Sequence, residues 1–81
     1  MRLRILNIES TLFDGDIREV NLMTESGEIT VLDQHSPMVT LVRSGFVKIK
    51  EPEGRERIIE LASTGFLEVE PEGRGITLLA A

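Results

Sequence analysis

Cysteine, tryptophan and tyrosine are absent from this chain of 81 residues, and histidine occurs once. Without cysteine there is no disulfide framework, and a single histidine cannot supply a Cys/His set for a structural zinc ion. No apolar run approaches the roughly 18 residues of a membrane-spanning helix. Packing of apolar side chains, within the chain or against a partner, therefore has to stabilise the fold.

Positive charge is scarce as well. Nine Lys and Arg face 14 Asp and Glu, which gives a net charge of −5. Binding to a phosphate backbone needs clustered basic side chains, so we expect no nucleic-acid partner. The start Met1-Arg2-Leu3-Arg4 is not followed by the apolar segment of a signal peptide. We expect a soluble cytoplasmic chain with no direct insertion into a membrane.

What the chain has in abundance is β-branched residues: six Val, eight Ile and six Thr, against three Ala. Branched side chains suit a pleated sheet and lose rotamer freedom in a helix. The sequence therefore predicts one all-β domain over residues 1–81, with turn signals at the spacing typical of a sandwich or barrel. The predicted strands are 2–8, 11–13, 16–23, 28–32, 38–43, 45–51, 55–61, 66–70 and 75–79.

Two hairpins can be specified in more detail. A three-residue loop over 52–54, with Gly54 in the left-handed region, brings opposite charges together across the strands, whereas a two-residue loop does not. The first register pairs Glu51 with Arg55, Lys50 with Glu56, and Val47 with Ile59. The alternation of apolar and acidic residues over 67–70, followed by the turn sequence 71–75, predicts the second hairpin.

Residues capable of chemistry are few. His35 lies beside Ser36 and near Asp33, but neighbours on an extended chain point in opposite directions, so we interpret this segment as a polar loop. The segment 14–16, Asp-Gly-Asp, lacks the other oxygen ligands of a calcium loop and is interpreted as a turn. We expect no catalytic residue, no metal site and no cofactor.

The segment 38–42, Met-Val-Thr-Leu-Val, is apolar on both alternating faces. In so small a domain, a strand buried on both sides is hard to cover from within the fold. Two interpretations stay open: one side meets another protein, or the segment is an ordinary interior strand.

A longer stretch carries a family resemblance. Residues 26–41, SGEITVLDQHSPMVTL, resemble the stretch Glu-Gly-Glu-x-Gly-(Val or Ile)-Leu-Pro-Gly-His-Ala-Pro-Leu-x-Thr of the epsilon subunit of F-type ATP synthases, called delta in mitochondria. Segments 12–17, 44–49, 63–69 and 76–80 continue the resemblance, which covers nearly the whole chain. This chain departs from the family pattern at four positions: Thr30, Asp33 and Gln34 replace Gly, Pro and Gly, and Thr64 replaces a Gly.

The resemblance implies a sandwich of two five-stranded sheets at the foot of the central stalk, between the gamma subunit and the ring of c subunits. Such a chain is a non-catalytic rotor part that couples translocation of ions, such as hydrogen ions, to ATP synthesis or hydrolysis. The C-terminal helical hairpin of bacterial epsilon subunits is not in this sequence, so we expect neither nucleotide binding nor inhibition. The implied location is peripheral, on the cytoplasmic face of the bacterial inner membrane.

Contact residues also follow from the resemblance. The implied contacts with the c ring are Glu28 and His35, and the implied contacts with gamma are Met38, Thr40, Val42, Ser63 and Thr64. The alternative function is a free-standing β-sandwich that binds a peptide or a sugar. Such a site orients its ligand with aromatic side chains, and three Phe with no Trp or Tyr disfavour it.

Overall fold

A computed structural model describes residues 1–80 and contains nine β-strands over that range, matching the predicted strands in number and order. One short 3-10 turn, Pro71–Gly73, was not predicted. Within residues 1–80 no helix is long and apolar enough to cross a bilayer. The strands are β1 Arg2–Leu6, β2 Thr11–Asp16, β3 Glu19–Thr24, β4 Gly27–Leu32, β5 Met38–Val42, β6 Gly45–Lys50, β7 Glu56–Leu61, β8 Gly65–Val69 and β9 Ile76–Ala80.

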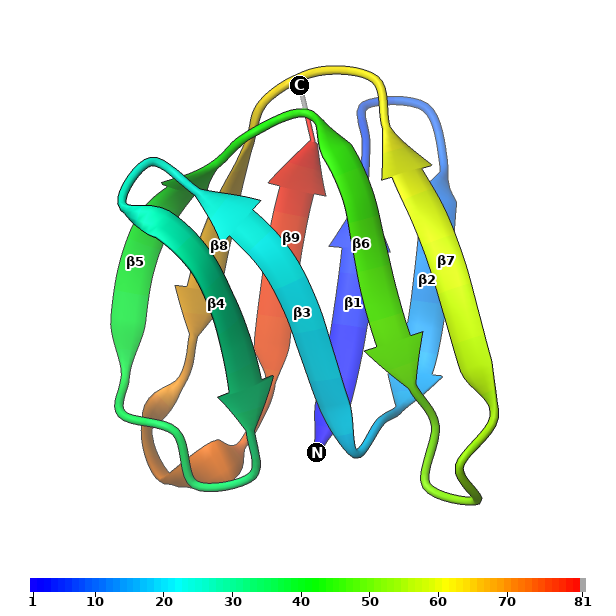
Figure 1. The fold of residues 1–81 in the computed structure, drawn as a ribbon, viewed down its shortest axis with the longest axis vertical. Helices are drawn as coiled ribbons and strands as arrows, with labels where there is room; N and C mark the ends of the chain where they lie inside the picture. The colour runs from blue at the N-terminus through cyan, green and yellow to red at the C-terminus, as the bar shows by residue number, and fades with distance from the viewer. Residues whose placement is uncertain (81) are drawn as a thin grey trace.

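The strands form two facing layers (Figure 1). The back layer has the order β2-β1-β9-β8-β5, and the front layer has the order β4-β3-β6-β7. One residue pair, Thr24 of β3 with Val42 of β5, joins the layers into a continuous nine-stranded sheet. The all-β sandwich is therefore confirmed, although its layers hold five and four strands where the resemblance implied five and five.

The core lies between the layers because alternate residues of each strand point inward. In β1, for example, Leu3 and Ile5 are fully buried while Arg2 and Arg4 are exposed. On the open side, the edge strands β2 and β7 are bridged by side chains: the Arg57 guanidinium lies 5.6 Å from the centre of the Phe13 ring. The buried apolar residues are Leu3, Ile5, Phe13, Ile17, Val20, Leu22, Val31, Val42, Val47, Ile49, Leu61, Leu67, Val69, Ile76 and Leu78.

Both predicted hairpins are confirmed. All three predicted pairs of β6 and β7 are present, and Gly54 has φ +97°. The Glu51 amide donates to the Arg55 carbonyl at 2.8 Å, and the Arg55 guanidinium donates to the Glu51 carboxylate at 2.7 Å. Strands β8 and β9 pair as predicted, and the Glu70 amide donates to the Gly75 carbonyl at 2.9 Å.

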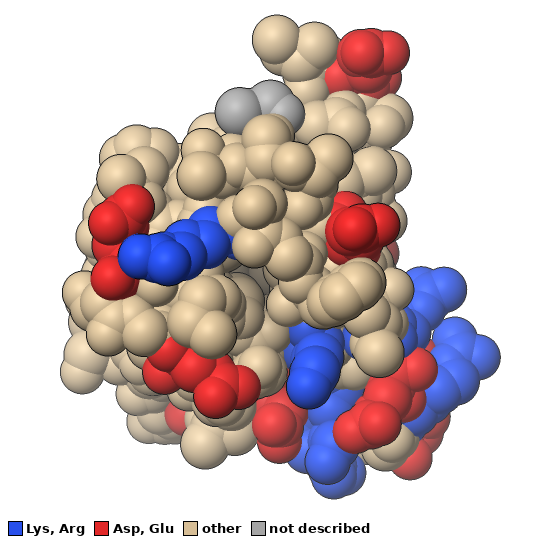
Figure 2. Space-filling view, turned by 45° about the horizontal axis from the view of Figure 1, so that its top comes forward, with Lys and Arg blue, Asp and Glu red and all other residues tan. Residues whose placement is uncertain are grey.

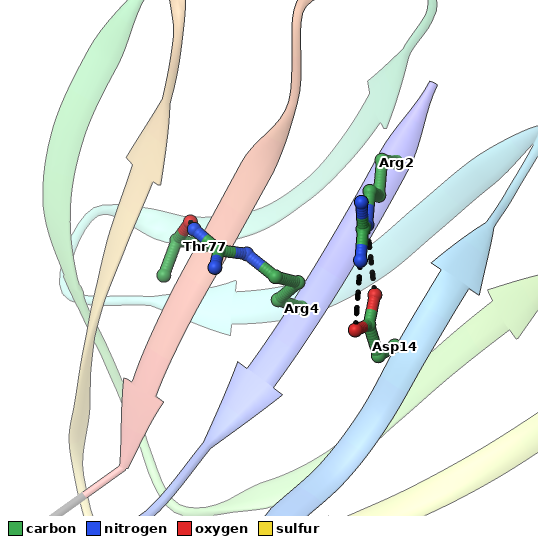
Figure 3. A network of polar contacts seen from close by, with 4 residues as sticks. All are labelled: Arg2, Arg4, Asp14 and Thr77. Carbon is green, nitrogen blue, oxygen red and sulfur yellow. Dashed lines mark hydrogen bonds and ion pairs between the residues drawn. The ribbon is translucent and has the colours of Figure 1, made fainter.

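The interpretation of 14–16 as a turn is wrong. Asp14, Gly15 and Asp16 form the second half of β2 and pair with β1. Asp14 points outward, where the Arg2 guanidinium donates to both of its carboxylate oxygens at 2.8 and 2.9 Å (Figure 3). Strand pairing and this cross-strand ion pair stabilise an extended segment whose composition favours a turn.

The connecting loops gather at two ends of the sandwich, because successive strands alternate in direction along the chain from β1 to β9 (Figure 1). The Ser26 end, at the top of the figure, carries loops 7–10, 25–26, 43–44 and 62–64. The His35 end, at the bottom, carries loops 17–18, 33–37, 51–55 and 70–75. Strand β9 runs toward the Ser26 end.

Candidate interaction surfaces

Glu28 is held at the Ser26 end by a tight turn between β3 and β4. The buried Thr24 hydroxyl donates to the Gly27 carbonyl at 2.8 Å and accepts from the Ser26 amide at 3.1 Å. Gly27 has φ +120°, a conformation that side chains other than glycine rarely adopt. Glu28 follows it, exposed on the outer face of the front layer, and no described residue forms an ion pair with it. Its carboxylate is available to a partner.

His35 lies at the other end of the molecule. Its amide donates to the Leu32 carbonyl at 3.1 Å, and Gln34 before it has φ +69°. That φ explains why the related pattern has Gly at position 34. Glu28 is near the start of β4 and His35 follows its end, so four strand steps of about 3.3 Å, or roughly 13 Å, lie between Glu28 and the last strand residue, Leu32. The structure does not bring the two implied ring contacts into one patch.

In the His35 loop, the imidazole contacts the Ser36 backbone and does not contact the Ser36 hydroxyl as a base would contact a nucleophile. His35 Nδ1 lies 2.7 Å from the carbonyl oxygen of Ser36, and not from its hydroxyl. A carbonyl oxygen can only accept, so Nδ1 holds the proton in this contact. Among the described residues, no three His, Cys, Asp or Glu side chains are grouped so as to hold a metal ion.

Strand β5 is apolar on both faces, as its sequence indicated, but the implied contact residues lie on the inner one. Val42 is 1% exposed and belongs to the core, while Met38 and Thr40 are half-buried on the same side. The outward residues are Val39, which is 64% exposed, and Leu41. The implied gamma contacts Met38, Thr40 and Val42 therefore lie on the face that is turned toward the core, as the pairing of Thr40 with buried Leu67 indicates.

Leu41 is one member of a row that crosses the outer face of the back layer. Register places it beside Phe66, Phe66 beside Leu79, and Leu79 beside Leu6. We call these four residues the apolar belt. Leu41, Phe66 and Leu79 are exposed, and with Thr64, Gly65 and Ala80 they line a shallow hollow of about 380 Å³. Thr64 is exposed at the belt, and Ser63 is half-buried next to it.

Gly65 lets β8 approach β9 closely beneath this hollow. A Cβ at position 65 would lie 2.7 Å from the Leu79 carbonyl oxygen and 3.3 Å from Leu78 Cδ1. Real Cβ atoms do not approach a backbone oxygen so closely, so only glycine fits without a shift of one strand.

The belt is bounded toward the His35 end by polar pairs. Arg4 donates to the Thr77 hydroxyl at 3.4 Å, and Arg2 binds Asp14 (Figure 3). The hydrogen bond from Arg2, with the positive charges of Arg2 and Arg4, lowers the pKa of the Asp14 carboxyl. The back layer thus divides into an apolar half near the Ser26 end and a charged half near the His35 end.

Comparison with known proteins shows the family of this chain. The family model described as "ATP synthase, Delta/Epsilon chain, beta-sandwich domain" matches residues 1–81. The chain belongs to this family. It is 38% identical over 80 residues to an ATP synthase epsilon chain of Herminiimonas arsenicoxydans, covering 99% of this chain and 56% of that protein. It is 36% identical over 67 residues to an ATP synthase epsilon chain of Polaromonas naphthalenivorans (strain CJ2), covering 83% and 48%.

Chains in two solved ATP synthase structures share the fold. A chain of the Euglena gracilis mitochondrial ATP synthase, in a structure of OSCP/F1/c-ring, superposes with a TM-score of 0.87 at 19% identity, covering 96% of this chain and 48% of that one. A chain of the Tetrahymena thermophila mitochondrial ATP synthase central stalk/c-ring gives 0.77 at 13%, covering 99% and 62%. This chain spans about half the length of the curated epsilon chains it matches.

Sequence reasoning missed the belt residues of this family member, although a signal for them was present. Apolar Leu67 and Val69 alternate with Glu68 along β8, so Phe66 points outward on the same side of the strand as Glu68. Two exposed phenylalanines, Phe46 and Phe66, lie on opposite layers and so cannot line one groove. The peptide- or sugar-binding alternative gains no support from their placement.

Proposed function

We propose that this chain acts as the sandwich domain of an ATP synthase epsilon subunit, a non-catalytic part of the rotor that links gamma to the c ring. In this role it transmits rotation between ion translocation and ATP synthesis or hydrolysis, and none of its residues performs chemistry. The observation that carries the proposal is the family match over residues 1–81. We place the complex peripherally, on the cytoplasmic face of the bacterial inner membrane.

The apolar belt is the proposed gamma contact. Its exposed side chains Leu41, Phe66 and Leu79 form a continuous row on a small soluble domain, and such rows mark protein interfaces. Thr64 lines the same hollow, and Ser63 adjoins it, so both stay within the proposed contact.

The c ring contact is proposed at the Ser26 end, through Glu28. The support is an exposed carboxylate on a rigid turn, without an ion-pair partner among the described residues. A ring contact that also includes His35 has to run along the whole of β4, which pairs only with β3. We therefore assign the principal contact to Glu28.

Charge reversal at one surface and charge insertion at the other test the two assignments together. Glu28→Lys is expected to weaken binding of the purified c ring about tenfold at low salt, with a smaller difference at high salt, because a rim charge acts mainly on association. Leu41→Asp is expected to weaken gamma binding by more than tenfold, because it places a charge inside an apolar contact. Each variant should keep its other partner.

Glu53→Lys is the matched control, since Glu53 is exposed in the β6–β7 loop at the opposite end from Glu28. Binding can be titrated by pull-down of gamma and of the c ring with each variant. If both Glu28→Lys and Leu41→Asp bind both partners like the parent at every salt concentration, the rotor assignment of these surfaces is wrong.

A further inference from the structure

The outer face of the front layer carries a second set of exposed apolar side chains, separate from the apolar belt. They are Met23 on β3, Leu32 on β4, Phe46 on β6 and Ile58 on β7. Figure 2 views this face and the Ser26 end: charged side chains are densest at the lower right, and smaller charged groups at the left and upper right are separated by uncharged surface.

Met23 and Phe46, but not Ile58, line a hollow of about 290 Å³. Gly45 forms part of its wall with φ +137°, and apart from its two chain neighbours no atom lies within 4 Å of the position a Cβ would occupy there. That backbone conformation favours glycine, so the wall carries no side chain at position 45.

Glu28 stands at the rim of the same hollow. Its strand position is directly opposite Met23, so the carboxylate adjoins the apolar wall. Lys48 lines the hollow as well and lies two residues after Phe46 on the same strand. A bound cation would be repelled by Lys48 and attracted by Glu28, which fixes the side of the hollow at which a positive charge can sit.

An arginine side chain has the chemistry that matches this arrangement. Its aliphatic stem covers apolar surface, its planar guanidinium stacks on an aromatic ring, and its paired N–H groups bind a carboxylate. Phe46 is 61% exposed, so its ring is accessible to such a group. A lysine would satisfy the charge but would forgo the stacking and the bidentate contact.

We infer that this hollow receives an arginine side chain of the c ring segment that meets Glu28, with the stem against Met23 and the guanidinium between the Phe46 ring and the Glu28 carboxylate. The inference rests on the proposed function, because the partner is the c ring. It adds Phe46 and Met23 to the residues that determine how tightly the ring is bound.

The test is a titration of the purified c ring against variants at position 46. Phe46→Leu keeps the apolar character and removes the ring quadrupole, and it is expected to weaken binding about three- to tenfold. Phe46→Tyr keeps the ring and should stay within about twofold of the parent. Ile58→Leu is the matched control: Ile58 is 64% exposed on the same face but does not line the hollow, and its replacement should change binding by less than about twofold.

The outcomes separate this inference from the function on which it rests. If Glu28→Lys weakens ring binding while Phe46→Leu and Phe46→Tyr both bind like the parent, the arginine site is wrong and the ring contact stands. Equal losses for Phe46→Leu and Ile58→Leu also overturn it, because they indicate a general apolar contact. If the parent chain does not bind the ring at all, the proposed function fails first. Circular dichroism of each variant checks that the fold is intact.

Discussion

Leu78 and Leu79 are consecutive residues of β9 with opposite surroundings, and they give a sharp test of the layer assignment. Leu78 is 0% exposed between the layers, whereas Leu79 is 53% exposed in the apolar belt. Leu78→Ala removes buried methyl groups and leaves a cavity, which costs about 2–5 kcal/mol in unfolding free energy. Leu79→Ala removes mostly solvated atoms and should cost about 0.5 kcal/mol or less.

The loss at Leu78 is large for a domain of this size. Typical stabilities of about 0.05–0.15 kcal/mol per residue give about 4–12 kcal/mol for 81 residues. At about 4–8 °C per kcal/mol, Leu78→Ala should lower the melting temperature by about 8–40 °C. Leu79→Ala should lower it by no more than about 4 °C, and its effect should appear in gamma binding.

Urea and thermal unfolding followed by circular dichroism measure both variants against the parent. The urea slope should be unchanged for both, because neither substitution alters the surface exposed on unfolding very much. Equal destabilisation by the two variants would refute the assignment of inner and outer faces on β9. It would also remove the argument that Leu79 is available to a partner.

Two further predictions concern β8 and the charged half of the back layer. Gly65→Ala should destabilise the domain by about 1–3 kcal/mol, because the new Cβ meets the Leu79 carbonyl. Gly15→Ala is the control: its Cβ would lie 3.6 Å from the Phe13 ring, so the substitution should be nearly neutral in the same unfolding assay. Arg2→Gln should return the lowered pKa of Asp14 toward its usual value in an NMR titration. Folding lowers the pKa of Asp14, so the ion pair contributes to the free energy of unfolding at pH values above the usual Asp pKa. That contribution is lost as the pH falls through the lowered pKa of the folded state. An unchanged Asp14 titration in Arg2→Gln would contradict the contact.

The hairpins could be predicted from short stretches of sequence because the residues that determine each turn and its register are close together in the chain. The opposite charges around 52–54 and the single permissive Gly54 leave one favourable register, and the structure has it. Asp14 to Asp16 shows the limit of the same reasoning: its turn composition is overridden by Arg2 and Arg4 on β1, which no local window contains.

The orientation of β5 could not be read from β5 itself, because both of its faces are apolar. Val39 and Leu41 differ little in hydrophobicity from Met38 and Val42, so the alternation of side chains along β5 does not show which set faces the core. Parity is set across the sheet instead: Leu67 of β8 points inward, Thr40 lies beside it, and Leu41 is thereby turned outward with Phe66. The belt is a property of register between strands, and it is encoded in no single strand.

The separation of Glu28 from His35 has the same origin. The family resemblance runs without interruption from residue 26 to residue 41, which makes its polar residues look like parts of one contact. An extended strand, however, advances about 3.3 Å with every residue, so the six residues of β4 carry the two polar segments to opposite ends of the sandwich. Residues close in an all-β sequence are joined in space only when a turn lies between them, as the turn at 25–26 joins Met23 to Glu28. The two proposed contact surfaces are therefore each assembled across strands: one from Glu28, Met23 and Phe46 on the front layer, and one from Leu41, Phe66 and Leu79 on the back layer.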